Sequence, residues 1–246
     1  MTDTTIRPEV KPGPKGLAGR LMGVVFSPRA AYADIVARPR VLGALLVVLV
    51  LTAGASVAFF STEVGRNAML EQQDRAMQQF GVRMSDAQYA QMQARMQGPA
   101  ALVFTSLGTI FFVPFLALVA SGIIIAVFNA VLGGDATFKQ IFALVVHAQF
   151  LSALQSLFVF PLDYAKESLS SPTSLAVFLP FLDEGSFAAR ALGSIDFFRI
   201  WFVVNLAIGI GVLYKRRTAP IATTLLAIYG VIALVIGAVS VALSGA

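Results

Sequence analysis

The chain has 246 residues, of which 57% are hydrophobic and only 13% are charged, and its mean hydropathy is +0.80. At this composition a water-soluble domain lacks the polar residues to cover its surface, so we expect lipid to be the main solvent. The absence of cysteine excludes disulfides, thiolate metal ligands and thiol nucleophiles. The formal net charge of +5 matters mainly through its placement around the apolar runs.

Five apolar runs are each long enough to cross a bilayer, which takes about 20 residues of helix. We therefore predict an all-α membrane protein, a bundle of five transmembrane helices that occupies residues 17–246 as one domain. A disordered basic tail over residues 1–16 precedes it. The predicted spans cover residues 41–61, 101–132, 138–160, 195–214 and 219–243.

The segment before the first span is basic and contains one helix signal. Its cations are Arg7, Lys11, Lys15, Arg20, Arg29, Arg38 and Arg40. Beside a membrane we expect them to meet anionic lipid head groups, at about 1 kcal/mol each, and not nucleic acid. Ser27 as N-cap, Pro28 at the first helical position and Pro39 as a stop predict a short helix. We expect this helix to lie in the cytoplasmic interface, either as a plain juxtamembrane helix or as a docking site for a partner.

The charges of the other connections predict the orientation of the bundle. The turn Lys215–Arg217 holds three bases and no acid, whereas residues 62–98 balance four bases with four acids. Residues 161–193 hold two bases and four acids. Because bases favour the cytoplasmic side, the N-terminus is predicted to be cytoplasmic and the C-terminus outside. Thirteen arginines against five lysines favour a GC-rich bacterial genome and hence an inner membrane.

The connection between the first two spans has helical composition. A break at Gly81 and a capping box from Ser85 to Gln88 predict two amphipathic helices. Methionines recur along them, among them Met92 and Met96 one turn apart. We interpret these side chains as packing contacts, with Cu(I) binding by thioethers as the alternative.

Small residues and a proline shape the predicted helix packing. Pro114 near the middle of the long second span predicts a kink. Gly122 and Ala126 share one face of that span, and Gly209 and Gly211 lie in the fourth span. Small residues let helix backbones approach closely, within a bundle or within an oligomer.

The third span carries most of the polar residues that lie inside a predicted span. Together with asparagines of its neighbours it gives a candidate intramembrane polar site: Asn129, His147, Gln149, Gln155 and Asn205. These groups do not converge by helical spacing alone, so the third span is predicted to be central. His147 could be a proton relay, a ligand or a pH sensor, or a buried neutral histidine bonded to Asn129 or Asn205.

Catalysis is not expected. The spans have no interior Asp, Glu or Cys, and the chain lacks GxSxG, HExxH and glycine-rich phosphate-loop motifs. We therefore predict no catalytic residues, no cofactor and no metal site.

Three segments in order resemble the Yip (Ypt-interacting protein) family, in its bacterial branch. They are FSPRAAYADIVARP, LGGDATFKQIFALVVHA and IDFFRIWFVVNLAIGIGV. The resemblance implies five helices, a cytoplasmic N-terminus, an outward C-terminus and no catalysis. Eukaryotic relatives bind Rab-type GTPases through an acidic-aromatic Gly-Pro signature. Here that place reads RPRVLGALLVV, so no residue is assigned to GTPase binding.

Two functional hypotheses follow. The first is a non-enzymatic inner-membrane protein that organises membrane or recruits partners, as a homo-oligomer or with another membrane protein. The alternative is a small-solute transporter or channel, with a path along spans two to four.

Overall fold

The computed structural model of the protein describes residues 13, 15–79, 82–131, 133–169, 171–183 and 185–243. The tail up to residue 12, the break expected at Gly81 and the chain end at Ala246 lie outside the described residues. The helices are α1 Leu17–Phe26, α2 Pro28–Ala37, α3 Leu42–Phe60, α4 Glu63–Gln79, α5 Asp86–Gln97, α6 Pro99–Ile125, α7 Phe138–Ala148, α8 Phe150–Lys166, α9 Phe187–Gly193, α10 Phe197–Leu213 and α11 Thr218–Leu243. A π-helical segment, Ala126–Val131, extends α6.

Four apolar stretches in the described residues are long enough to cross a membrane. They are Leu42–Phe60, Ala100–Ala130, Phe138–Lys166 and Thr218–Leu243. The predicted fourth span is the shorter helix α10, whose 17 residues extend about 25 Å, less than the ~30 Å of a hydrocarbon core. Helix α10 starts after its N-cap Asp196, and the chain turns at Lys215, where φ is positive.

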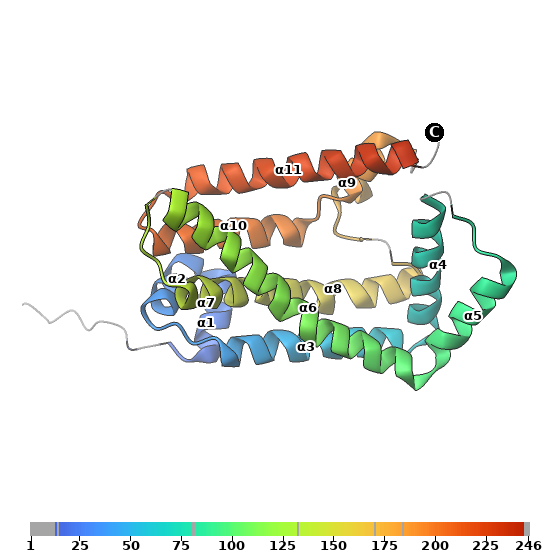
Figure 1. Ribbon diagram of the computed structural model, residues 1–246, viewed down its shortest axis with the longest axis horizontal. Helices are drawn as coiled ribbons and strands as arrows, with labels where there is room; N and C mark the ends of the chain where they lie inside the picture. The colour runs from blue at the N-terminus through green and yellow to red at the C-terminus, as the bar shows by residue number, and fades with distance from the viewer. Residues whose placement is uncertain are drawn as a thin grey trace, which may run out of the picture.

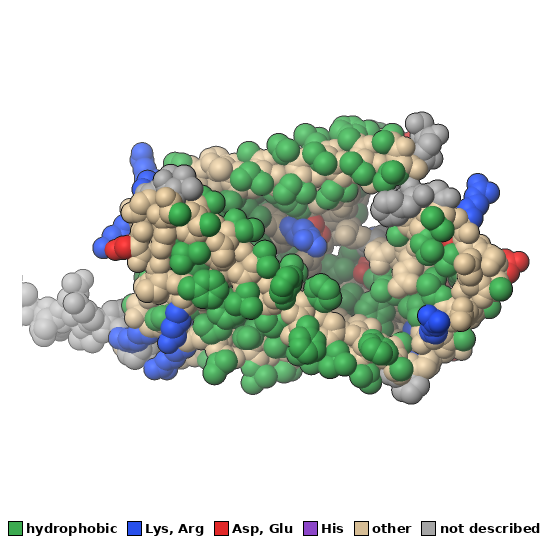
Figure 2. Space-filling view, viewed as in Figure 1, with side chains coloured by type: hydrophobic (Ala, Val, Ile, Leu, Met, Phe, Trp, Pro, Cys, Tyr) green, Lys and Arg blue, Asp and Glu red, His purple; other side chains and the backbone are tan. Residues whose placement is uncertain are grey.

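Helices α3, α8, α10 and α11 run along the length of the molecule, and α6 crosses them obliquely (Figure 1). The pair α1–α2, the α6–α7 turn and the α10–α11 turn share one end, called here the basic end. Helices α4 and α5 lie at the opposite end, called the α4 end. Hydrophobic side chains cover the long side, and most Lys and Arg side chains seen in this view lie toward the two ends (Figure 2). This distribution is typical of a membrane-embedded bundle.

The continuous unit of α7 and α8 is the centre of the bundle. In its most apolar stretch 56% of the residues are buried, compared with 11–17% in the other three candidate spans. Within α7, every residue from Ala143 to Ala148 is buried. A helix that is buried all round must have protein on every side. The prediction of a central third span is confirmed, although the helix continues to Lys166.

The short helix predicted before the first span is confirmed as α2, and a further helix, α1, precedes it. In this pair Val24, Tyr32 and Ile35 have no exposed surface. They pack against α7 and α10 in one hydrophobic cluster. Ser27 stands at the N-cap position of α2, but its side chain makes no capping bond. The apolar face therefore meets protein rather than lipid alone.

A partly buried ion pair joins α1 to α2. Arg20 is 3% exposed, and its Nε lies 2.8 Å from Oδ2 of Asp34. Its Nη1 also donates to the carbonyl of Arg38 at 3.0 Å. A methyl group on Gly23 would lie 2.9 Å from the Cβ of Ala31, so the two helices touch backbone to side chain here. The ion pair and this close contact together hold α1 and α2 against each other.

The two helices predicted between the first two spans are present as α4 and α5. The capping box of α5 is confirmed: the Gln88 backbone N–H donates to Ser85 Oγ at 3.3 Å. The Ser85 backbone N–H donates in return to Gln88 Oε1 at 2.9 Å. Helix α4 stands across the end of the bundle (Figure 1).

The burial of α2 generates the first prediction. Replacing Ile35 by alanine should lower the free energy of unfolding by about 2–5 kcal/mol, because the cavity left would lie between α2 and the bundle. Phe26→Ala, at a side chain that is 75% exposed, is the control and should change it little. Reversible unfolding in mixed micelles measures both. Small and equal changes in the free energy of unfolding for the two variants would mean that this face of α2 contacts lipid instead.

Candidate functional site

The five residues of the predicted polar site are not brought together by the fold. Asn129 and Asn205 make contacts toward the basic end, Gln155 lies toward the α4 end, and His147 and Gln149 lie between them. No hydrogen bond joins any two of the five in the described part of the chain. They therefore do not form one site, and each must be considered by itself.

Asn129 fastens the end of α6 to the end of α10. Its Nδ2 donates to the carbonyl of Ala136 at 2.8 Å, and its Oδ1 accepts from the Tyr214 hydroxyl at 2.8 Å. The Tyr214 ring stacks on Phe128 with centroids 4.9 Å apart. A Cβ on Gly134 would lie 2.5 Å from the Tyr214 ring, so only glycine fits there. We call these contacts the Asn129 latch.

Asn205 fastens α10 to α1. It is 1% exposed, and its hydrogen-bond surroundings assign its amide the orientation in which both the nitrogen and the oxygen have a partner. In that orientation the nitrogen donates to the carbonyl of Val24 at 2.9 Å, and the oxygen accepts from Trp201 Nε1 at 3.1 Å. A buried amide with these two partners contributes to helix packing.

Gln155 belongs to a buried network around Asp196 that the sequence did not reveal. Its Nε2 donates to Asp196 Oδ1 at 2.9 Å, and Thr173 donates to the other carboxylate oxygen. Asp196 also caps α10 by accepting from two backbone N–H groups. Its own N–H donates to the Tyr229 hydroxyl of α11 at 3.0 Å. The network joins α8, α10, α11 and the connection after α8.

His147 and Gln149 keep one unpartnered acceptor each. Nδ1 of His147 is 2.7 Å from the carbonyl of Ala143; since a carbonyl only accepts, Nδ1 carries the proton. Nε2 of the same ring has no partner in the described residues. Gln149 donates to the carbonyl of Val113 at 3.2 Å, while its Oε1 has none. The expected bond from His147 to Asn129 or Asn205 is not made, because each asparagine has other partners.

The predicted packing residues fall into two groups. Gly209 lies against α7, where a Cβ would be 2.8 Å from Leu144 Cγ, and Gly211 lies against Thr218 at 3.0 Å. Gly122, by contrast, has nothing within 4 Å of a Cβ, and Ala126 is exposed. That face of α6 is therefore unoccupied within the described chain. Pro114 lies inside α6.

The described residues contain no group of three or more His, Cys, Asp or Glu side chains that could hold a metal ion.

The three sequence segments that carry the family resemblance meet in space. They contribute α2, α7 and α10, and residues from all three pack in one hydrophobic cluster. A sequence model of the Yip1 domain matches residues 22–241. The chain belongs to the Yip1 domain family. Comparison with curated proteins gave no match, and comparison with solved structures gave none either.

The Asn129 latch of this Yip1-domain protein gives the second prediction. Gly134→Ala should lower the free energy of unfolding by about 1–3 kcal/mol, because the methyl group would collide with Tyr214. Gly122→Ala should be neutral or stabilising, since alanine is favoured in a helix and space is open there. Chemical denaturation in detergent compares the two. Equal changes in the free energy of unfolding for the two variants would contradict the role assigned to the Asn129 latch.

The Asp196 network gives the third prediction. Asp196→Ala should cost about 3 kcal/mol or more, because it removes the cap of α10 and leaves Gln155 and Thr173 unpaired. Asp86→Ala, at an exposed position in the first turn of α5, serves as the matched control. Thermal unfolding followed by circular dichroism is the measurement. A control that is as unstable as Asp196→Ala would contradict a special role for Asp196.

Proposed function

We propose that this Yip1-domain protein is a non-enzymatic membrane protein that organises membrane or recruits partners through its basic end. The observation that carries the proposal is the rigid attachment of α1 and α2 to the bundle. Tyr32 and Ile35 are fully buried while Met22 and Phe26 of the same pair are 53% and 75% exposed. A fixed pair of helices with exposed apolar side chains and the exposed Arg29 is suited to docking.

The proposal includes five crossings, with the N-terminus in the cytoplasm and the C-terminus outside. Helix α10 is short, but α9 packs beside the last part of α11 while the α10–α11 turn lies at the basic end (Figure 1). This arrangement supports a fifth crossing of the membrane along α10. The bases of the Lys215–Arg217 turn favour the cytoplasm for that end. A bacterial inner membrane fits the excess of arginine over lysine.

The basic residues before the first span extend this proposal to lipid. Arg29 is exposed on α2, as are Arg38 and Arg40 beyond it. Together with the cations near the start of the chain they would hold the basic end against anionic head groups. A second copy or another membrane protein would then be recruited at the membrane surface.

Transport is the second candidate, and one observation favours it. The unpartnered Nε2 of His147 and Oε1 of Gln149 both lie in the central span. Buried acceptors without partners are unusual and can mark a path or a ligand. Against it, Asn129, Gln155 and Asn205 are engaged in packing contacts, so the polar groups do not line one path.

Native mass spectrometry of the protein in lipid discs prepared from its own membrane distinguishes recruitment of a partner from transport of a solute. We expect a defined oligomer or a bound protein, lost in Met22→Ser/Phe26→Ser and kept in Val82→Ser/Tyr89→Ser. The second pair removes exposed apolar groups at the α4 end instead.

The contrary result is equally concrete. A small-molecule adduct that disappears in His147→Ala or Gln149→Ala, with only monomer mass and no bound protein, would reject recruitment and establish the central span as a solute site.

A further inference from the structure

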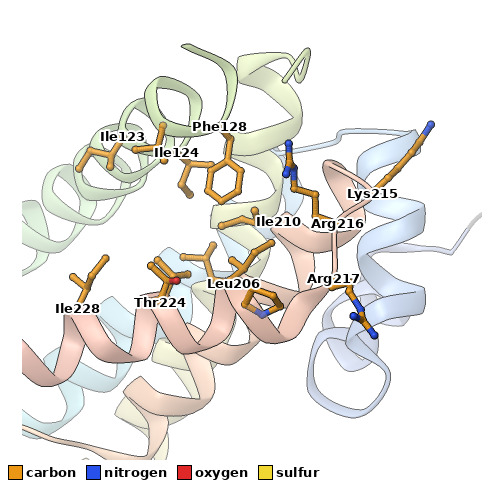
Figure 3. Close-up of a pocket in the computed structure, with 14 residues that line it drawn as sticks. Ile123, Ile124, Phe128, Leu206, Ile210, Lys215, Arg216, Arg217, Thr224 and Ile228 are labelled. Atoms are coloured by element: carbon orange, nitrogen blue, oxygen red, sulfur yellow. The ribbon is translucent and has the colours of Figure 1, made fainter. Parts of the chain in front are cut away.

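A groove between α6 and α11 is a large apolar hollow near the basic end. It encloses about 680 Å³, within the range of sites that hold a small ligand. Ile123 and Val127 belong to its α6 wall, Leu206 of α10 forms its floor, and Ile221 and Ile228 belong to its α11 wall. Figure 3 shows the labelled side chains of the two walls on either side of this space.

The groove exists because α11 is attached to only part of the bundle. Helix α11 packs on α10 and α9, whereas α6 packs on α3 and α7. The Asn129 latch holds the end of α6 to Tyr214, directly before the α10–α11 turn. The two walls are thus fixed at the turn and separated beyond it.

Three cations border one end of the groove. Lys215, Arg216 and Arg217 all border it, and all three are exposed. In Figure 3 Arg216 lies beside Phe128, while Lys215 and Arg217 project from the turn away from the apolar walls.

A second hollow of about 690 Å³ borders the same three cations and adds Arg29 of α2. Arg29 is held toward the turn by a bond from Nη2 to Thr218 Oγ1 of 3.2 Å. Among the described residues that line the two hollows, none is acidic. The positive charges of Arg29, Lys215 and Arg217 thus favour an anion at this point.

The combination decides the class of ligand. A free anion would leave the apolar walls uncovered, and an apolar helix of another protein would bring no negative charge to the cations. An amphiphile with an anionic head and hydrocarbon chains satisfies both. We propose that the groove holds one anionic glycerophospholipid, with its phosphate at the Lys215–Arg217 turn and an acyl chain between α6 and α11. This site goes beyond the proposed function, since either a recruiter or a transporter could carry it.

Native mass spectra of the delipidated full chain, titrated with phosphatidylglycerol or with phosphatidylcholine of the same acyl chains, test the proposal. We expect one tightly held phosphatidylglycerol and much weaker phosphatidylcholine binding. Lys215→Gln/Arg217→Gln should weaken that adduct by about fivefold for each charge removed. Arg83→Gln/Arg95→Gln removes the same charge from exposed positions near the α4 end and should leave the adduct unchanged.

A second pair of variants keeps every charge and so separates the groove from general attraction. Ile228→Trp fills the groove and should abolish the tightly held lipid. Ile232→Trp places the same ring one turn away on α11, at a residue with nearly the same exposure, 50% against 51%, and should retain it. Equal binding of the two lipids, or unchanged binding in both Lys215→Gln/Arg217→Gln and Ile228→Trp, would overturn the proposal.

Discussion

The basic end depends on one buried core, formed where α2 and α10 close on α7. Ala31, Tyr32 and Ile35 enter it from α2, and Leu144 of α7 fits against Gly209 of α10. Since hydrocarbon gives no hydrophobic drive for helices to associate, close packing and buried polar contacts must supply it. The Asn205 amide supplies such a contact by joining α10 to the backbone of α1. The three segments that carry the family resemblance supply this core.

Polar residues within the apolar helices mainly form hydrogen bonds that join one helix to another. The Asn129 latch joins α6 to α10 near one end, and the Asp196 network joins α8, α10 and α11 nearer the other. Each replaces water by protein partners where water is scarce, which is the condition for a polar group to remain inside a membrane. His147, Gln149 and Asp163 of the central span depart from this pattern, as does Tyr32 of α2, because each keeps a buried side-chain atom without a hydrogen-bond partner among the described residues.

The sequence predicted the features that arise within one stretch of chain. Apolar length located four candidate spans, the polarity of the third span indicated its central position, and the Ser85 to Gln88 spacing predicted the cap of α5. It could not show what an apolar face meets: Tyr32 and Ile35 have the same spacing whether they contact lipid or α7. Nor could it identify Asp196 as a network centre, because its partners Gln155 and Thr173 are 41 and 23 residues away. Contacts of that kind are set by tertiary structure alone.

The burial of α1 and α2 also determines the order in which their contacts can form during translation. These helices are made before α10, and Val24 finds the Asn205 amide only when α10 has emerged about 180 residues later. Until then the pair can contact α7 but lacks its contacts with α10, and loop closure over such a distance is slow. The packing of α1 and α2 is therefore completed only after α10 has been made.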